Sequence, residues 1–116
     1  MSERFVRALE RITRIGGVQG AMLVAADDGL IIADASMEGV RGNAVAALAA
    51  SLAKRFTRVS KAATVGAPRF LHLQAEQGTL IVVAALGGVL VVTMGGADMN
   101  VGLARLEMLR VAEVVA

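Results

Sequence analysis

The feature that most constrains this chain is a run of twenty-one residues without a charge, between Glu76 and Asp98. A run of that length is long enough to cross a lipid bilayer as a helix. Gly87-Gly88 lies at its centre, however, and divides it into two β-branched segments of strand length, LIVVAA and VLVV. The flanking charges are acidic, and the chain has neither Trp nor Tyr to mark a membrane interface. A glycine pair between two apolar runs is typical of a tight hairpin, so we favour two paired strands over a membrane span.

The rest of the chain divides into short elements with clear boundaries. Apolar residues at helical spacing predict three helices, over 3–15, 40–60 and 99–114. Apolar runs bounded by turn residues predict five strands, over 21–26, 30–35, 69–75, 79–86 and 89–94. Asp28-Gly29, between the first two strands, is a strong hairpin signal because both residues tolerate a positive φ.

This order of elements determines the expected fold. Tight turns between consecutive strands make the sheet mostly antiparallel. Several strands are apolar at every position, so both faces of the sheet must be covered by helices. We therefore expect an α+β fold, an α/β/α sandwich around a five-stranded sheet with the order α-β-β-α-β-β-β-α. With 116 residues the chain is long enough for one core, so we expect a single domain over 1–116.

Composition excludes several classes of function. The chain has no cysteine and one histidine, so thiol chemistry and Cys- or His-rich metal sites are excluded. With three Phe as the only aromatic residues and a net charge of +2, it has neither the stacking platform nor the clustered basic excess of a nucleic-acid-binding domain. Four arginines within residues 2–14 leave no apolar core for a signal peptide, so we expect a cytoplasmic protein.

Candidate catalytic residues are few, and each has a simpler interpretation. His72 lies between two leucines in a predicted strand and has no partner in the sequence, which favours a packed or interface histidine over a base or ligand. Asp27 and Asp28 precede a glycine, where turn chemistry accounts for them. We expect no catalytic residue, cofactor or metal, and we interpret the chain as a binding module and not an enzyme.

The helix predicted over 40–60 has two apolar sides. Its larger residues recur at helical spacing and are expected to face the sheet: Val45, Leu48, Leu52, Phe56 and Val59. The opposite side carries Asn43, Ala47, Ala50, Ser51, Lys54, Arg58 and Lys61, and its first half has almost no polar residues. Two explanations remain open at this point: another backbone packs closely there, or alanine is simply the best helix former.

The segments that carry these turns and helices resemble the Roadblock/dynein light chain family, including its bacterial MglB-like branch. The resemblance rests on IGGVQGAMLVAADDGLIIA (15–33), VAALAASLAKR (45–55), GTLIVVAALGGVLVV (78–92) and NVGLARLEM (100–108). It extends from Phe5 to about Val111. It implies a fold similar to profilin and longin domains, in agreement with the architecture expected from the elements.

The resemblance also implies a partner and a mode of assembly. Members of this family dimerise by pairing their third strands edge to edge, which here would be 69–75, with the helices over 40–60 side by side. Interface residues would then include Ala47, Ala50, Phe70, Leu71, His72 and Leu73. Members bind small Ras-like GTPases or act as scaffolds, through the surface of the paired helices. That surface would include Asn43, Ser51, Lys54 and Arg58.

The leading hypothesis is therefore a non-catalytic homodimer that regulates or scaffolds a small GTPase. The alternative is a profilin-like sensory domain that binds a small molecule between the sheet and its helices. The chain places few polar groups near its apolar strands, which weighs against such a ligand site.

Overall fold

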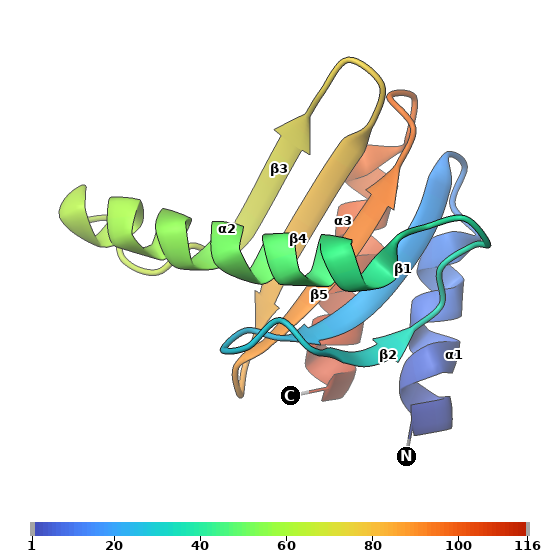
Figure 1. Cartoon of the computed structure of the whole chain (residues 1–116), viewed down its shortest axis with the longest axis horizontal. Coiled ribbons are helices and arrows are strands. Elements are labelled where there is room, and N and C mark those ends of the chain that lie inside the picture. The colour runs from blue at the N-terminus through green and yellow to red at the C-terminus, as the bar shows by residue number, and fades with distance from the viewer. Residues whose placement is uncertain (1, 116) are drawn as a thin grey trace.

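The computed structural model describes residues 2–115 and has the predicted order of elements (Figure 1). The helices are α1 (Ser2–Thr13), α2 (Gly42–Ala62) and α3 (Val101–Val115). The strands are β1 (Val18–Ala25), β2 (Ile31–Asp34), β3 (Phe70–Gln74), β4 (Thr79–Ala85) and β5 (Val89–Gly95). The predicted ranges agree with these bounds to within a few residues at each end.

The strands form one sheet in the order β2-β1-β5-β4-β3, and every neighbouring pair is antiparallel. Both predicted hairpins are present, and Gly29, Gly87 and Gly88 at their turns have positive φ values of 73°, 80° and 74°. The uncharged run therefore forms β4 and β5. Over residues 2–115, no helix has both the length and the apolar character needed to cross a bilayer.

Helices cover both faces of the sheet, as the apolar strands require. Helices α1 and α3 lie on one face, where Leu9, Leu23 and Met108 are among the fully buried residues of the core. Helix α2 lies alone on the other face, over a smaller core that includes Met22 and Val92 (Figure 1). The fold is the expected α/β/α sandwich of the α+β class.

The orientation of α2 differs from the prediction. The side chains that pack against the sheet are alanines, Ala46, Ala49 and Ala50, whereas three of the larger residues expected there, Leu48, Phe56 and Val59, are 70%, 42% and 62% exposed. The reason is distance. A Cβ placed on Gly29 would lie 3.0 Å from the Cα of Ala47, so α2 approaches the β1–β2 turn too closely for a large side chain to fit between them.

A second close approach joins the end of β5 to the segment before β1. The backbone N–H of Gly96 donates a hydrogen bond of 2.9 Å to the carbonyl oxygen of Gly17. A Cβ on Gly95 would collide with that same carbonyl oxygen and lie 2.8 Å from the sulfur of Met99. Gly95 is therefore required by the space around it.

We predict that Gly95→Ala lowers the free energy of unfolding by about 1–3 kcal/mol, the usual cost of overpacking. Gly16→Ala is the matched control because a Cβ at Gly16 would meet nothing within 4 Å. Urea denaturation followed by circular dichroism measures both variants. Equal stability of the two variants would contradict the close crossing at Gly95.

Candidate interaction surface

The outer edge of β3 has no neighbouring strand within residues 2–115. On its inner edge β3 pairs with β4, with Leu71 opposite Val82 and Leu73 opposite Leu80. The N–H of Ala84 donates a hydrogen bond to the carbonyl oxygen of Arg69. This bond shows that Arg69, and every second residue after it, directs its backbone groups toward β4. In an antiparallel ladder alternate residues direct their N–H and C=O groups to opposite sides. Phe70, His72 and Gln74 therefore direct theirs outward, where another strand can bond to them.

Strand β3 lacks the features that usually protect a sheet edge. Its sequence, FLHLQ, contains no proline and no charge, and Leu73 is 52% exposed. The other edge strand, β2, is shorter, with four residues, and ends at the charged Asp34. Of the two edges, β3 is the one suited to pairing with another chain.

The two faces of β3 differ. Leu71 packs against the core under α2, whereas Phe70 packs against the core on the α3 side. The guanidinium group of Arg105 lies 4.8 Å from the centroid of the Phe70 ring, a cation–π contact that covers this ring. His72 is exposed, and its Nε2 lies 3.3 Å from Oε1 of Gln74. The imidazole thus lies at the free edge and not in the core.

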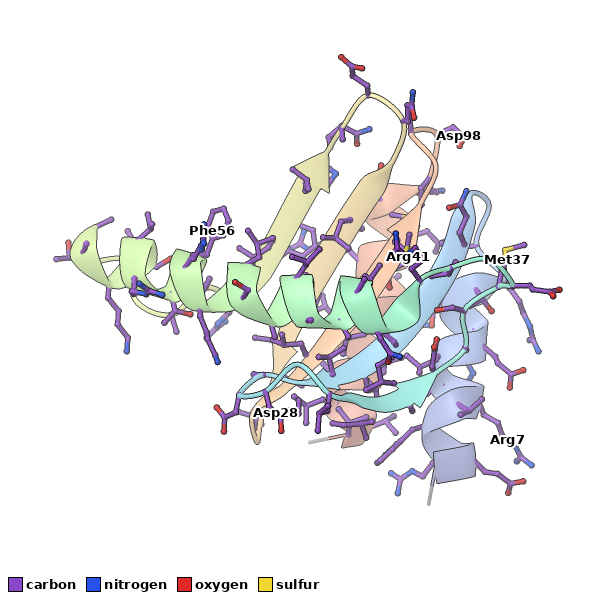
Figure 2. All side chains as sticks on the ribbon, viewed as in Figure 1. Arg7, Asp28, Met37, Arg41, Phe56 and Asp98 are labelled. Carbon is purple, nitrogen blue, oxygen red and sulfur yellow. The ribbon has the colours of Figure 1, made fainter. Side chains whose placement is uncertain are left out.

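An apolar groove adjoins this edge on the α2 side. It has a volume of about 380 Å³ and lies between Leu52 and Phe56 of α2 and Leu71, Leu73 and Leu80 of the sheet. We call it the α2–β3 groove. Its helix residues belong to a stripe at spacings of four and three that the sequence had assigned to the core: Leu48, Leu52, Phe56 and Val59. Figure 2 shows Phe56 on the side of α2 opposite to the one that faces Asp28.

The four residues expected to bind a partner are all exposed: Asn43, Ser51, Lys54 and Arg58. They lie on the outer surface of α2 and on its side toward the β1–β2 turn, away from the α2–β3 groove. The ammonium group of Lys54 donates a hydrogen bond to the carbonyl oxygen of Asp27, which ties the helix to that turn.

Most of the residues expected at an interface lie at the surface, but one of them lies in the core. Phe70, Leu71, His72 and Leu73 lie on the free edge strand, as the sequence placed them. Ala47 is exposed, but Ala50 is only 4% exposed and packs against the protein's own sheet near Gly29. Ala50 is therefore a core residue, and its expected contact with a second chain is not compatible with this burial. The alanine side of α2 does have a close backbone neighbour, namely the β1–β2 turn.

Sequence reasoning missed the leucine stripe as a surface feature. Leu48, Leu52 and Phe56 were assigned to the core because large apolar side chains usually lie there. The signal that could have identified the packed side of α2 was the pair of alanines on either side of Leu48, together with Gly29. Small residues on both the helix and the β1–β2 turn indicate that the two pack closely.

Asp28, in the β1–β2 turn, has a structural role. Oδ1 of Asp28 accepts a hydrogen bond of 3.1 Å from the N–H of Leu30, which closes the β1–β2 turn as the sequence predicted. Across residues 2–115, no three His, Cys, Asp or Glu side chains gather into a potential metal site. What the residues around β3 and α2 present is an apolar surface next to a row of unpaired backbone groups, an arrangement suited to binding a protein.

Comparison with known proteins agrees with this geometry. Residues 5–94 match the Roadblock/LC7 domain family. Protein MJ1340 of Methanocaldococcus jannaschii is 31% identical over 109 residues, which cover 94% of each chain.

Two solved structures share the fold. An MglB with a tetrameric arrangement superposes with a TM-score of 0.90 at 25% identity, and the gliding protein MglB of Thermus thermophilus with a TM-score of 0.88 at 24% identity. Each alignment covers 99% of this chain and 87% of the other. The matched residues span all five strands, so this chain belongs to the Roadblock/LC7 domain family.

Proposed function

We propose that this chain is a non-catalytic cytoplasmic homodimer that binds a small Ras-like GTPase and regulates or scaffolds it. The observation that carries the proposal is the continuity of the free β3 edge with the α2–β3 groove, in a chain that belongs to the Roadblock/LC7 family. The similarity to an MglB with a tetrameric arrangement supports self-association.

The β3 edge supplies the first of two contacts in the proposed dimer. Two copies of β3 run antiparallel across a twofold axis, so the outward N–H and C=O groups of Phe70, His72 and Gln74 bond to the second copy. This pairing extends the sheet across both chains and satisfies backbone groups that a long exposed edge leaves open. A twofold interface is the commonest form of homodimer.

Helix α2 supplies the second contact between the two copies. Its C-terminal part extends past β3 and beyond the edge of the sheet (Figure 1). After the edges pair, this overhanging part lies above the sheet of the second copy. By symmetry, the second copy's α2 enters the α2–β3 groove and covers Leu52, Phe56 and Leu73. Apolar side chains that are exposed in one chain are then buried in two.

The outer surface of the two α2 helices is the proposed platform for the GTPase. It carries Asn43, Ser51, Lys54 and Arg58 from each chain, all exposed. The C-terminal half of α2 also carries Arg55 and Lys61 and has no acidic residue, so it fits a partner with an acidic surface.

We predict that Leu73→Asp weakens the dimer at least a hundredfold. An unpaired charge buried at an interface costs about 3–5 kcal/mol, and a twofold interface contains the change twice. Light scattering across a concentration series measures the dissociation constant. The matched control is Leu30→Asp, an exposed leucine on the connection between β1 and β2 at the far edge of the sheet, which leaves the dimer intact.

Two results would contradict the proposed dimer. One is a wild-type chain that stays monomeric at the highest soluble concentration. The other is a Leu73→Asp variant that dimerises as strongly as the Leu30→Asp control.

We predict that the chain binds a Ras-like GTPase encoded near its gene when the GTPase holds a non-hydrolysable GTP analogue, and not when it holds GDP. Arg58→Glu reverses a charge on the platform and weakens this binding about tenfold. Arg7→Glu, on α1 at the other face of the molecule (Figure 2), leaves it unchanged. Biolayer interferometry with immobilised GTPase gives the three affinities. Equal binding of the two nucleotide states, or equal effects of the two variants, would contradict the platform.

A further inference from the structure

A second hollow lies on the other side of α2, away from the α2–β3 groove. Its volume is about 230 Å³, and it opens between α2 and the ends of β4 and β5, beside Asp27 of the β1–β2 turn. Engineered cavities of about 150 Å³ in protein cores hold a benzene molecule, so this one has room for a small organic compound. We call it the α2–hairpin cavity.

The cavity exists because the residues around it are small. Its helix wall contains Ala53 and Thr57, and the end of β4 and the turn that follows it contribute further small residues: Ala84, Ala85 and Gly88. Leu71, Val82 and Leu90 form an apolar floor. A compound that enters therefore meets apolar surface on most sides, as ligands of preformed sites do.

The polar groups at the rim of the cavity favour a compound with a negative charge. The hydroxyl of Thr57 already donates its proton, at 2.7 Å, to the carbonyl oxygen of Ala53. The remaining side-chain donors are Lys54 and Arg69, both cationic, and Arg69 forms no salt bridge within residues 2–115. Asp27 is the one acid among the lining residues, so the rim has an excess of one positive charge. A ligand with a carboxylate offers acceptors to both cationic donors.

The cavity and the proposed dimer contact use different sides of α2. Leu52 and Phe56 line the α2–β3 groove, whereas Ala53, Lys54 and Thr57 line the cavity, and these two sets lie on different sides of the helix. A second copy that fills the groove therefore meets a different side of the helix from the one that lines the cavity, although Leu71 and Val82 border both spaces.

We propose that the α2–hairpin cavity binds a small organic anion with an apolar body and a single carboxylate, held by Arg69 and Lys54. Lys54 also belongs to the proposed GTPase platform, so the site borders that surface, and it gives this family member a place to sense a metabolite of that class. The apolar floor provides the contact area, and the cationic rim selects the anion over neutral and cationic compounds of the same shape.

The test uses three six-carbon probes that differ in their head group: hexanoate, hexanol and hexylamine. Each is titrated into the full-length protein, and amide chemical shifts are followed by two-dimensional NMR. Hexanoate is expected to shift the amides of Ala53, Ala84 and Gly88, with an affinity about tenfold higher than that of hexanol. Hexylamine is expected to bind more weakly than either.

Two variants locate the site. Arg69→Gln, at an exposed position, lowers the hexanoate affinity to that of hexanol and leaves the hexanol affinity unchanged. Ala84→Leu fills the cavity and abolishes binding of all three probes. Ala63→Leu adds the same bulk at an exposed position just past α2 and leaves all three affinities as in the wild type.

Any of three results would overturn the proposal. The first is that no amide chemical shift changes with a 20-fold excess of hexanoate at millimolar protein concentration. The second is that the amides that shift lie outside the cavity. The third is that hexanol or hexylamine binds as tightly as hexanoate. Binding of hexanoate that Arg69→Gln leaves unchanged would refute the role of the cationic rim. Because the readout is ligand binding to the isolated chain, it does not depend on whether a GTPase binds.

Discussion

The close contact between α2 and the β1–β2 turn determines most of the surface described above. Ala46, Ala49 and Ala50 bring the helix so near to the sheet that Gly29 lies against the backbone at Ala47. With alanines used for this contact, the larger residues of α2 lie to the side, where Leu48 and Phe56 are exposed. The apolar stripe is therefore a consequence of how the core is packed. A single chain leaves it uncovered, and the proposed dimer would bury this apolar surface.

The two edges of the sheet differ in how readily another strand could pair with them. At one edge, β2 has four residues, ends at Asp34, and the Oδ1 of that residue accepts a hydrogen bond from the N–H of Ser36. A charged side chain and a short ladder discourage further strands there. At the other edge, β3 has unpaired backbone groups and no charge. In the proposed dimer, pairing through β3 alone gives a closed pair, whereas two open edges would permit a continuing array.

Local signals in the sequence predicted most of the fold. Asp28-Gly29 and Gly87-Gly88 identified the hairpins because few residues adopt a positive φ without strain. The period-two geometry of a strand accounts for Leu71 and Phe70 packing on opposite faces of β3. The pairing of β1 with β5, which joins the two hairpins into one sheet, was not predicted because it links segments about seventy residues apart and has no local signal. The side of α2 that packs on the sheet was predicted wrongly, since burial was judged by side-chain size. Close packing of backbones instead selects the smallest residues, as at Ala49 and Gly29.

Helix α2 also connects the two hollows on its sides. Leu71 and Val82 line both the α2–β3 groove and the α2–hairpin cavity, so the same two side chains touch whatever fills either space. The backbone of α2 lies nearest to β1, β2 and β5, whereas side chains such as Leu71 of β3 and Val82 of β4 join the same core. The same helix bounds both hollows. Thermodynamic linkage then makes the effects reciprocal: if an anion in the cavity alters the affinity of one chain for another, dimerisation alters the affinity for the anion by the same factor.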